Sequence, residues 1–454
     1  MSPPARMDYL DTLAAFAADV SLARLGEPAT AAARLVLLDT LGAMLAGSAQ
    51  PENARLARAM AERASRPAAT LIGHAAKADP LLATLVNATA GVALEVDEGN
   101  RWGGGHPAIH VVPGALAVAE ERGADGARLL EALVAGYEVS SRIGGATVPR
   151  PNVHSHGTWG TIGTAVAVAR LAGQDARAMR EIINLAASMS PANTWTPALE
   201  GATVRNAYPG RSGLQGILAV ELHRAGFTGL ADAPADVYGT ILADQFEPAR
   251  ALEDWGGPLR IERNYFKLYA CCRYNHPALD ALAAIRRREP VAAAEVAAAE
   301  VVVFPFGLRM ATPDPANLLA AKFSIPWAVA AALVLAHGDL AAFSDEARAD
   351  ARIRDLARRV TVTTDGEMTP RRSDYPTSRL RLSLRDGRVL EGETGVVRGD
   401  ADNPVPEAEV LAKFQALAAP VLGAHRTGQL VAAVLAFEEM KNVAHLGALL
   451  SPPA

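Results

Sequence analysis

Cysteine is nearly absent from this 454-residue chain, which has only two, the adjacent Cys271 and Cys272. A framework of several disulfides is therefore excluded, and so is an iron–sulfur centre, because such clusters are held chiefly by several cysteine thiolates. Aromatic residues make up 5% of the chain, whereas half of its residues are hydrophobic. The core must then consist mainly of small and aliphatic side chains, which favours closely packed helices.

Runs of positive charge are also absent. The 44 basic and 49 acidic residues leave a net charge of −5, with no basic patch that would indicate a nucleic-acid partner. No apolar segment reaches the roughly 18 residues that a membrane helix needs. Residues 1–9 lack the charged start and apolar run of a secretory leader. We therefore expect a cytoplasmic protein with no membrane partner, large enough for two domains.

The first half of the chain has the pattern of a helical domain. Apolar residues recur there at the spacing of amphipathic or buried helices. The segment 161–172 contains only small and apolar residues apart from its threonines and one arginine, and we expect it to be fully buried. The predicted helices are 9–20, 29–46, 52–64, 80–96, 114–122, 126–139, 161–172, 177–187 and 213–225.

The pattern changes near residue 263. Strand-like runs occur at 300–304 and 359–363, and residues 378–391 alternate around Asp386-Gly387, which is the signal of a β-hairpin. Helices are predicted at 277–288 and 326–336, and again after Pro406 at 407–418 and 428–446. The fold class is thus mainly α with an α+β insertion. A helical domain formed by 1–262 and 403–454 would carry an α+β domain at 263–402.

Residues 95–107 are the most informative stretch of the sequence. Three carboxylates precede a triple glycine at 103–105, and His106-Pro107 follows it. Glycines at this density indicate a sharp bend or a close approach of the backbone to a ligand. Four of the ten histidines lie at 106, 110, 154 and 156. Imidazole transfers protons near neutral pH, so both histidine clusters are candidates for acid–base chemistry.

Five motifs together resemble the MmgE/PrpD family, which includes 2-methylcitrate dehydratase, cis-aconitate decarboxylase and iminodisuccinate epimerase. They occur in the family's order over nearly the whole chain. The motifs are the acidic segment before His106-Pro107, the His-x-His-Gly-Thr-Trp-Gly run at 154–160, the segments 200–210 and 224–229, the run 266–273 and the run 321–326.

The resemblance implies a large all-helical domain built from both chain ends, with an inserted α+β lid. It also implies a homodimer and an active site in the cleft between the domains. Members of the family need no metal or organic cofactor. They act on small di- and tricarboxylates by moving a proton on the carbon next to a carboxylate, so the chain is expected to be a lyase (a hydro-lyase) or an isomerase.

The same resemblance implies roles for individual residues. His106 is expected to act as general acid or base, and Asp97 to orient a histidine or accept a proton. Of His154 and His156, one would transfer protons and the other would orient it. Lys267, which begins the lid, would grip a substrate carboxylate or act as a base once the lid closes. The residues expected to bind substrate are Arg205, Arg101, Tyr208, Asn206, Cys272 and Ser324.

Three departures from decarboxylase-like members bear on the reaction. Arg205 stands where they carry a lysine, Trp327 where they carry a tyrosine, and Gly99 where they carry a threonine. A guanidinium binds a carboxylate through two parallel hydrogen bonds, but it does not act as a general acid or base because it stays protonated. We therefore favour a dehydration, hydration or epimerisation of the 2-methylcitrate dehydratase type over the decarboxylation of a cis-aconitate-like acid.

Two further classes of protein remain open. A metal-dependent hydrolase would use His106, His154, His156 and Asp97 as ligands. A non-catalytic dimer would keep the fold and bind a carboxylate through its arginines, without converting it to a product.

Overall fold

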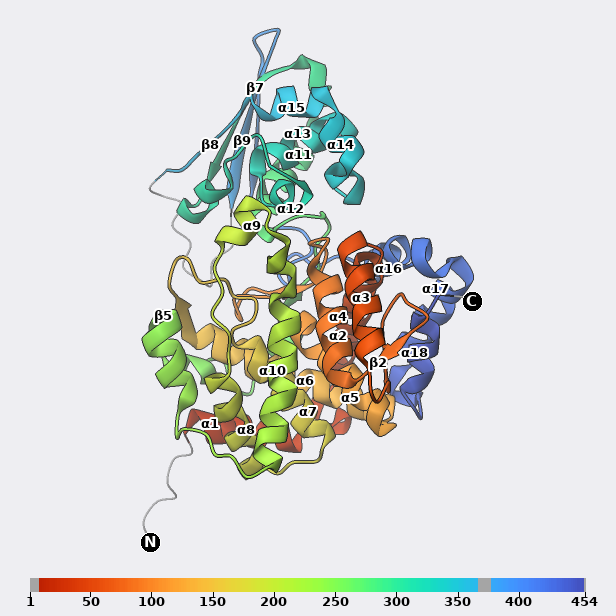
Figure 1. Cartoon of the computed structure of the whole chain (residues 1–454). Coiled ribbons are helices and arrows are strands. Elements are labelled where there is room, and N and C mark those ends of the chain that lie inside the picture. Colours follow the sequence, from red (N-terminus) through yellow and green to blue (C-terminus); the bar gives the residue numbers. More distant parts are fainter. Residues whose placement is uncertain (1–7, 366–376, 453–454) are drawn as a thin grey trace.

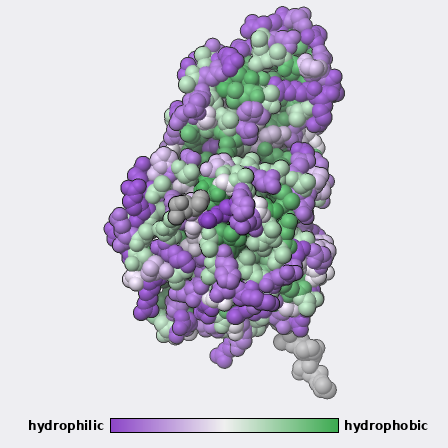
Figure 2. Space-filling model, turned by 90° about the vertical axis from the view of Figure 1, so that its right-hand side faces the viewer, coloured by the Kyte–Doolittle hydropathy of each residue, from purple (hydrophilic) through white to green (hydrophobic). Residues whose placement is uncertain are grey.

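The computed structural model describes residues 8–365 and 377–452. The first seven residues, on which the expected absence of a leader partly rests, lie outside that range. Figure 1 shows two lobes, a larger helical lobe and a smaller lobe built on a sheet. The space-filling view shows the smaller lobe seated on the larger one (Figure 2). This mainly helical architecture with small sheets agrees with the fold class predicted from the sequence.

The helical lobe is arranged around α7 (Gly160–Leu171). All but one of its residues are buried, as the sequence predicted, and it packs on α5, α6, α8 and α10. Small residues permit this packing, since a Cβ at Gly136 of α6 would lie only 2.3 Å from the carbonyl oxygen of Gly163. The other helices of the first half are α1 (Tyr9–Asp19), α2 (Leu22–Ser48), α3 (Pro51–Arg63), α4 (Pro80–Val92), α5 (Pro107–Arg122), α6 (Gly126–Ala146), α8 (Ala176–Ser188), α9 (Thr196–Glu200) and α10 (Ala207–Arg224).

Helix α2 corrects one expectation from the sequence. Among the described residues it is the one helix long and apolar enough to cross a membrane, although no such segment was expected. Its most apolar window is 78% buried within the protein, between α4, α6 and α16. The helix is also interrupted at Gly26, whose φ of 75° lies in the left-handed region. Its position in the structure is therefore that of a core helix.

The smaller lobe, called the sheet lobe below, contains a four-stranded sheet in the order β10-β9-β7-β8. β8 is parallel to β7, and the other pairs are antiparallel. The predicted hairpin at Asp386-Gly387 is confirmed, with Gly387 at a φ of 91°. The elements are α11 (His276–Arg288), β7 (Val296–Val303), α12 (Leu318–Lys322), α13 (Ile325–Leu335), α14 (Asp345–Ala349), α15 (Ala351–Ala357), β8 (Val360–Thr363), β9 (Ser378–Leu384) and β10 (Val389–Thr394).

The C-terminal segment packs on the helical lobe. α16 (Glu407–Leu422) and α17 (Ala424–Leu435) pack on α2, and α18 (Ala444–Leu450) packs on α5. The prediction of one helix over 428–446 was wrong, because the chain breaks between α17 and α18. Phe437 is fully buried in this break and the backbone N–H of Gly126 donates to the carbonyl of Met440, so the loop is fixed by the helical lobe.

A short sheet that the sequence analysis missed lies where the two lobes meet. β3 (Gly99–Asn100) pairs antiparallel with β6 (Asn264–Tyr265), with Gly99 opposite Tyr265 and Asn100 opposite Asn264. A Cβ on Gly99 would lie 2.3 Å from the ring of Tyr265, so the threonine of decarboxylase-like members could not occupy this position without moving that ring. Next to this sheet, the backbone N–H of Phe266 donates to the carbonyl of Gly399 at 2.9 Å. The two passages of the chain between the lobes are thus hydrogen-bonded to each other.

Candidate active site

The acidic segment turns sharply between α4 and α5. After α4 ends at Val92, Glu95 adopts a φ of 56°, an uncommon conformation for a residue with a side chain. The following residues form β3, and the triple glycine closes a tight loop in which Asn100 and Gly105 exchange backbone hydrogen bonds. The loop returns the chain so that His106 becomes the N-cap of α5. The glycines therefore bend the backbone, one of the two functions predicted for them.

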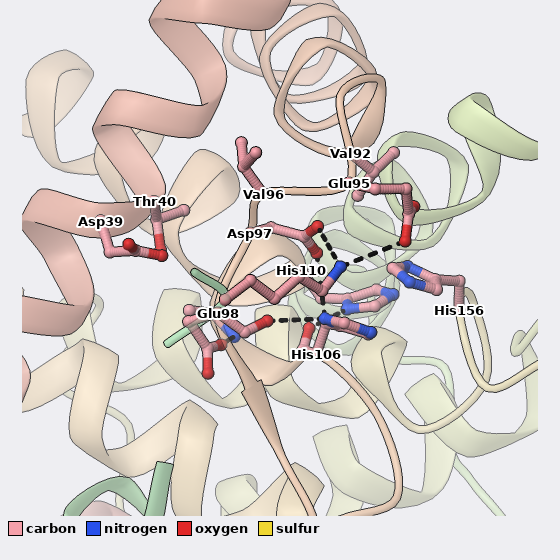
Figure 3. Close-up of polar contacts among 12 residues, drawn as sticks. Asp39, Thr40, Val92, Glu95, Val96, Asp97, Glu98, His106, His110 and His156 are labelled. Atoms are coloured by element: carbon pink, nitrogen blue, oxygen red, sulfur yellow. Dashed lines mark hydrogen bonds and ion pairs between the residues drawn. The ribbon is translucent and has the colours of Figure 1, made fainter. Parts of the chain in front are cut away.

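A continuous line of contacts, called the charged line below, joins the buried side chains of Arg205, Glu95, Lys267 and Asp97 to the partly buried His106. Figure 3 labels Glu95, Asp97 and His106 of this line. Arg205 Nη1 lies 2.5 Å from Glu95 Oε1. Lys267 Nζ donates to Glu95 Oε2 and to Asp97 Oδ1, each at 3.1 Å. Asp97 Oδ2 then lies 3.1 Å from His106 Nδ1. The side chains of the four charged residues are at most 2% exposed, so these pairs are shielded from solvent and salt.

The geometry defines which ring nitrogen of His106 is reactive. Nδ1 faces two acceptors, the carbonyl oxygen of Glu98 at 2.6 Å and the carboxylate of Asp97, so it carries the proton. Nε2 is then the atom with the free lone pair. The His106 side chain is 13% exposed, more than any other member of the line. His106 was the residue most favoured by the sequence, although it begins a helix rather than occupying an exposed turn.

His156 lies directly against His106. Their ring centroids are 4.8 Å apart with planes inclined by 22°. His156 Nε2 is 3.4 Å from Arg205 Nη2, which can only donate, so the ring proton is assigned to Nδ1. Nδ1 has no hydrogen-bond partner among the described residues. Burial first, and then the charge of Arg205, lowers the pKa of His156 well below its usual range, so the ring is neutral.

His154 stands one step further from the charged line. Its Nδ1 accepts a hydrogen bond from the backbone N–H of His156 at 3.0 Å, and its ring packs on Trp195 with centroids 4.1 Å apart. Burial and the charge of Arg205 lower its pKa well below the usual range as well. His156 is therefore the member of the pair that contacts both His106 and Arg205, while His154 supports the loop that carries it.

His110 is fully engaged in the framework. Its Nδ1 bonds to the carbonyl of His106 at 2.8 Å, and its Nε2 accepts the backbone N–H of Gly157 at 3.0 Å. Burial lowers its pKa to about 4. Because both of its ring nitrogens are used, His110 connects α5 to the 154–160 loop.

Glu95 and Glu98 were missed as site residues. Glu98 Oε1 accepts from the backbone N–H of Ala108 at 2.7 Å, and Tyr137 donates to Oε2 at 3.1 Å. Burial, together with the negative charges of Asp39 and Asp97, raises the pKa of Glu98 to about 8. One feature of the sequence pointed to Glu95 and Glu98. They are acidic residues that directly follow a predicted buried helix, where solvent-exposed charges are not expected.

Electrostatics keep the line ionised despite its burial. Burial alone would raise the pKa of Asp97, but the charges of Lys267 and His106 and the hydrogen bond from His106 hold it well below its usual range. Burial would lower the pKa of Lys267, yet Asp97 and Glu95 raise it above the usual value. Lys267 is accordingly a fixed cation in the free protein. It already contacts the cluster, so the expected delivery of Lys267 by a closing lid does not apply to this structure.

Two of the expected substrate-binding residues point elsewhere. Arg101 makes an ion pair with Asp402 at 3.1 Å and stacks over Trp102. Ser324 is the N-cap of α13, where it accepts from the backbone N–H of Trp327 at 3.0 Å and donates to the carbonyl of Thr312. The indole of Trp327 is buried and donates to the carbonyl of Ala342, so it forms core rather than a pocket wall.

Of the other four, Arg205 belongs to the charged line itself and three lie beside it. Tyr208 of α10 meets the ring of His154 edge-on, with centroids 5.9 Å apart. Asn206 is buried, and its Oδ1 has no hydrogen-bond partner among the described residues. Cys272 is buried, and burial followed by the charge of Glu95 raises its pKa to about 12, which excludes a thiolate at neutral pH.

A cavity of about 680 Å³ lies between the lobes. Ala93, Leu94 and Asn206, which flank Glu95 and Arg205 in sequence, border it from the helical lobe. Lys322 and Phe343 border it from the sheet lobe, with Lys322 Nζ 4.9 Å from the centre of the Phe343 ring. Burial lowers the pKa of Lys322 to about 8. The five residues of the charged line do not themselves border this cavity.

The donor set was also considered as a metal site. Among the described residues, Asp97, His106 and His156 offer ligand atoms within 4.8 Å of one another. Asp97 Oδ1 is held by the ammonium of Lys267, and Oδ2 lies 3.1 Å from His106 Nδ1. A metal ion would have to displace that ammonium, since two cations cannot share one buried carboxylate cheaply. The residues fit a metal poorly while Lys267 stays in place.

Comparison with known proteins agrees with the resemblance seen in the sequence. The MmgE/PrpD N-terminal domain matches residues 11–247, and the MmgE/PrpD C-terminal domain matches residues 269–438. Cis-aconitate decarboxylase from Aspergillus terreus (strain NIH 2624 / FGSC A1156) is 24% identical over 454 residues, covering 93% of this chain and 91% of the relative. The cis-aconitate decarboxylase-like protein oryM of Aspergillus oryzae (strain ATCC 42149 / RIB 40) is 24% identical over 457 residues, covering 92% of each.

Proposed function

Because the chain belongs to the MmgE/PrpD family, we propose that it is a cofactor-independent lyase or isomerase acting on a small di- or tricarboxylate. The observation that carries the proposal is the position of His106. Its Nε2 has a free lone pair, and its Nδ1 is held by Asp97 and Glu98 at the end of a line that also contains Lys267 and Arg205. A base beside two fixed cations suits the removal of a proton next to a carboxylate.

The reaction would begin with His106 Nε2 removing a proton from the carbon next to a substrate carboxylate. The electron pair left on carbon spreads into that carboxylate as an enolate-like species. Arg205 and Lys267 would stabilise this added charge, in a buried site where electrostatic interactions are strong. Asp97 would stabilise the imidazolium formed on His106.

His156 is the second proton carrier in this proposal. Its Nδ1 carries a proton without a hydrogen-bond partner among the described residues, and its ring stacks on His106. In a dehydration it would give that proton to the leaving hydroxyl, which departs as water. In an epimerisation it would return a proton to the opposite face of the carbon. The proton that His106 took from carbon would then pass to the His156 ring, so that both imidazoles end either reaction neutral.

We favour dehydration, hydration or epimerisation, because Arg205 replaces the lysine of decarboxylase-like members. Decarboxylation of a cis-aconitate-like acid is the second candidate, and the names of the relatives at 24% identity support it. A homodimer in the cytoplasm is proposed on the family resemblance alone. Light scattering of the purified protein would measure the subunit number.

The test is proton NMR in heavy water with EDTA-treated protein. The panel contains 2-methylcitrate, citrate, cis-aconitate, iminodisuccinate and substituted succinates. We expect conversion or deuterium incorporation for at least one acid, and its loss in His106→Ala. His74→Ala, a half-buried histidine outside the cluster, is the matched control and should remain active.

Two outcomes would contradict the proposal. Activity that appears only when zinc is restored would favour the metal-dependent hydrolase, with Lys267 displaced from Asp97. Binding of a polycarboxylate without any exchange of its C–H protons would favour the non-catalytic binding protein.

A further inference from the structure

The cations of the cluster are already neutralised by the protein itself. Glu95 contacts both Arg205 and Lys267, and Asp97 contacts Lys267 from the other side. Two positive and two negative side chains therefore sum to zero in a volume that solvent hardly reaches. A substrate carboxylate that simply joined this cluster would bring an uncompensated charge into the interior, which is costly.

Of the two carboxylates, Glu95 is the one that a ligand can displace from the cations. Asp97 is held by His106 as well as by Lys267, whereas the two cations are the ion-pair partners of Glu95 among the described residues. Glu95 also holds a left-handed backbone conformation, which is strained for a residue with a side chain. The residues before it, Ala93 and Leu94, border the cavity between the lobes.

We propose that the carboxylate of Glu95 occupies the subsite of one substrate carboxylate, and that a substrate carboxylate replaces it across Arg205 and Lys267. This inference rests on the proposed function, since it concerns the same site. It makes Glu95 a specificity-determining residue. A ligand must carry at least one full carboxylate to compete with Glu95, so an amide or an ester of the same acid would be rejected.

The exchange would be accompanied by proton uptake. Burial and the charge of Asp97 favour the protonated form of Glu95, while Arg205, Lys267 and His106 favour the ionised form and lower its pKa in the free protein. Lys322 and Cys272 also face it electrostatically. When the ligand takes over Arg205 and Lys267, burial becomes the dominant influence. Glu95 then binds about one proton per ligand, as linkage requires.

The test is isothermal titration calorimetry with succinate and propane-1,2,3-tricarboxylate at pH 7. Titrations in two buffers of different ionisation enthalpy give the number of protons bound. We expect the wild-type protein to take up about one proton per ligand. Glu95→Gln should bind at least tenfold more tightly and take up none, because its side chain no longer competes for the two cations.

Glu138→Gln is the matched control. Glu138 also forms a buried carboxylate–arginine pair, with Arg142 at 2.6 Å, but on α6 and outside the cluster. It should lose stability as Glu95→Gln does while binding the acids like the wild type.

Weaker binding by a folded Glu95→Gln protein, or wild-type binding without proton uptake, would overturn the inference. The wild-type proton count holds even if the variant fails to fold. If the wild type converts no acid in the NMR test and binds neither probe, the proposed function falls. If it turns a polycarboxylate over but takes up no proton on binding, only the subsite inference falls.

Discussion

Asp97 places a negative charge beside the imidazole that would become cationic during proton transfer. The hydrogen on Nδ1 of His106 is directed to the carbonyl of Glu98, so the tautomer does not depend on Asp97 alone. Asp97→Asn should therefore keep the ring orientation and lose the stabilisation of the imidazolium. We expect kcat to fall by about 10²- to 10⁴-fold with little change in KM.

Steady-state kinetics on the acid identified by NMR would measure this effect. Asp400→Asn is the control, because Asp400 is a buried carboxylate paired with Arg273 rather than with a histidine. A similar loss of kcat in both variants would mean that Asp97 acts through stability and not through His106.

Glu98 makes the stability of the protein depend on pH. The pKa of Glu98 is about 8 in the folded protein against an ordinary value of 4.5, because the carboxyl is buried. Between these values the unfolded chain has released this proton and the folded chain keeps it. The contribution of Glu98 to the free energy of unfolding therefore decreases as pH rises from 4.5 to 8 and is level above that.

Glu98→Gln should remove this slope. A glutamine can still accept from Ala108 and can donate to Tyr137, so the fold is retained. Urea titrations at pH 5.5 and 8.5 would show the variant gaining stability relative to the wild type at the higher pH. The exposed Glu221→Gln should run parallel to the wild type. If the stability of Glu98→Gln changed with pH just as that of the wild type does, Glu98 would not be a buried carboxyl that stays protonated in the folded protein.

At the scale of elements, the start of α13 explains Ser324. A serine N-cap replaced by alanine costs about 0.5–2 kcal/mol of stability. We expect Ser324→Ala to show such a loss in chemical denaturation with KM unchanged, because both bonds of its hydroxyl go to backbone groups. Ser344→Ala, the N-cap of α14, is a matched cap in the same lobe. A rise in KM for Ser324→Ala alone would restore the substrate-binding role.

Helices were predicted well where apolar residues recur at helical spacing. Their first residues were predicted less well, because a single hydrogen bond or proline can determine where a helix begins. α5 begins at Pro107, seven residues before the predicted start, because a proline is favourable in the first turn and Glu98 accepts from Ala108. α10 begins at Ala207 rather than at 213 for the same kind of reason, with Pro209 in its first turn. A two-residue strand such as β3 has no periodicity to detect.

At the scale of the whole molecule, the site depends on contacts between distant segments. His106, Asp97 and Lys267 could be proposed from the sequence as separate candidates. Their joining into one line could not, because Glu95 and Lys267 are 172 residues apart and meet near the place where β3 pairs with β6. The bridging position of Glu95 follows from that meeting, and no local pattern predicts it.

Hydrogen exchange would test whether this line is assembled before substrate binds. We expect the backbone amides of 97–108 and 264–267 to exchange slowly in the free protein, because β3–β6 pairing and the Phe266–Gly399 bond protect them. The loop at 227–231, which is largely exposed, should exchange quickly. Protection that appears only after a polycarboxylate is added would mean that Lys267 is brought in by closure of the lobes.

The bond between Phe266 and Gly399 has a consequence for how such proteins diversify. The chain enters and leaves the sheet lobe at neighbouring points, and an ion pair between Arg273 and Asp400 closes the same junction. A segment with adjacent ends can be exchanged by recombination without rerouting the rest of the fold. Glu95, Asp97, His106 and Arg205 all stay on the helical side of that junction. Lys267 lies on the other side of it, so an exchanged segment would have to bring a lysine at this position while the shape of the cavity roof varied.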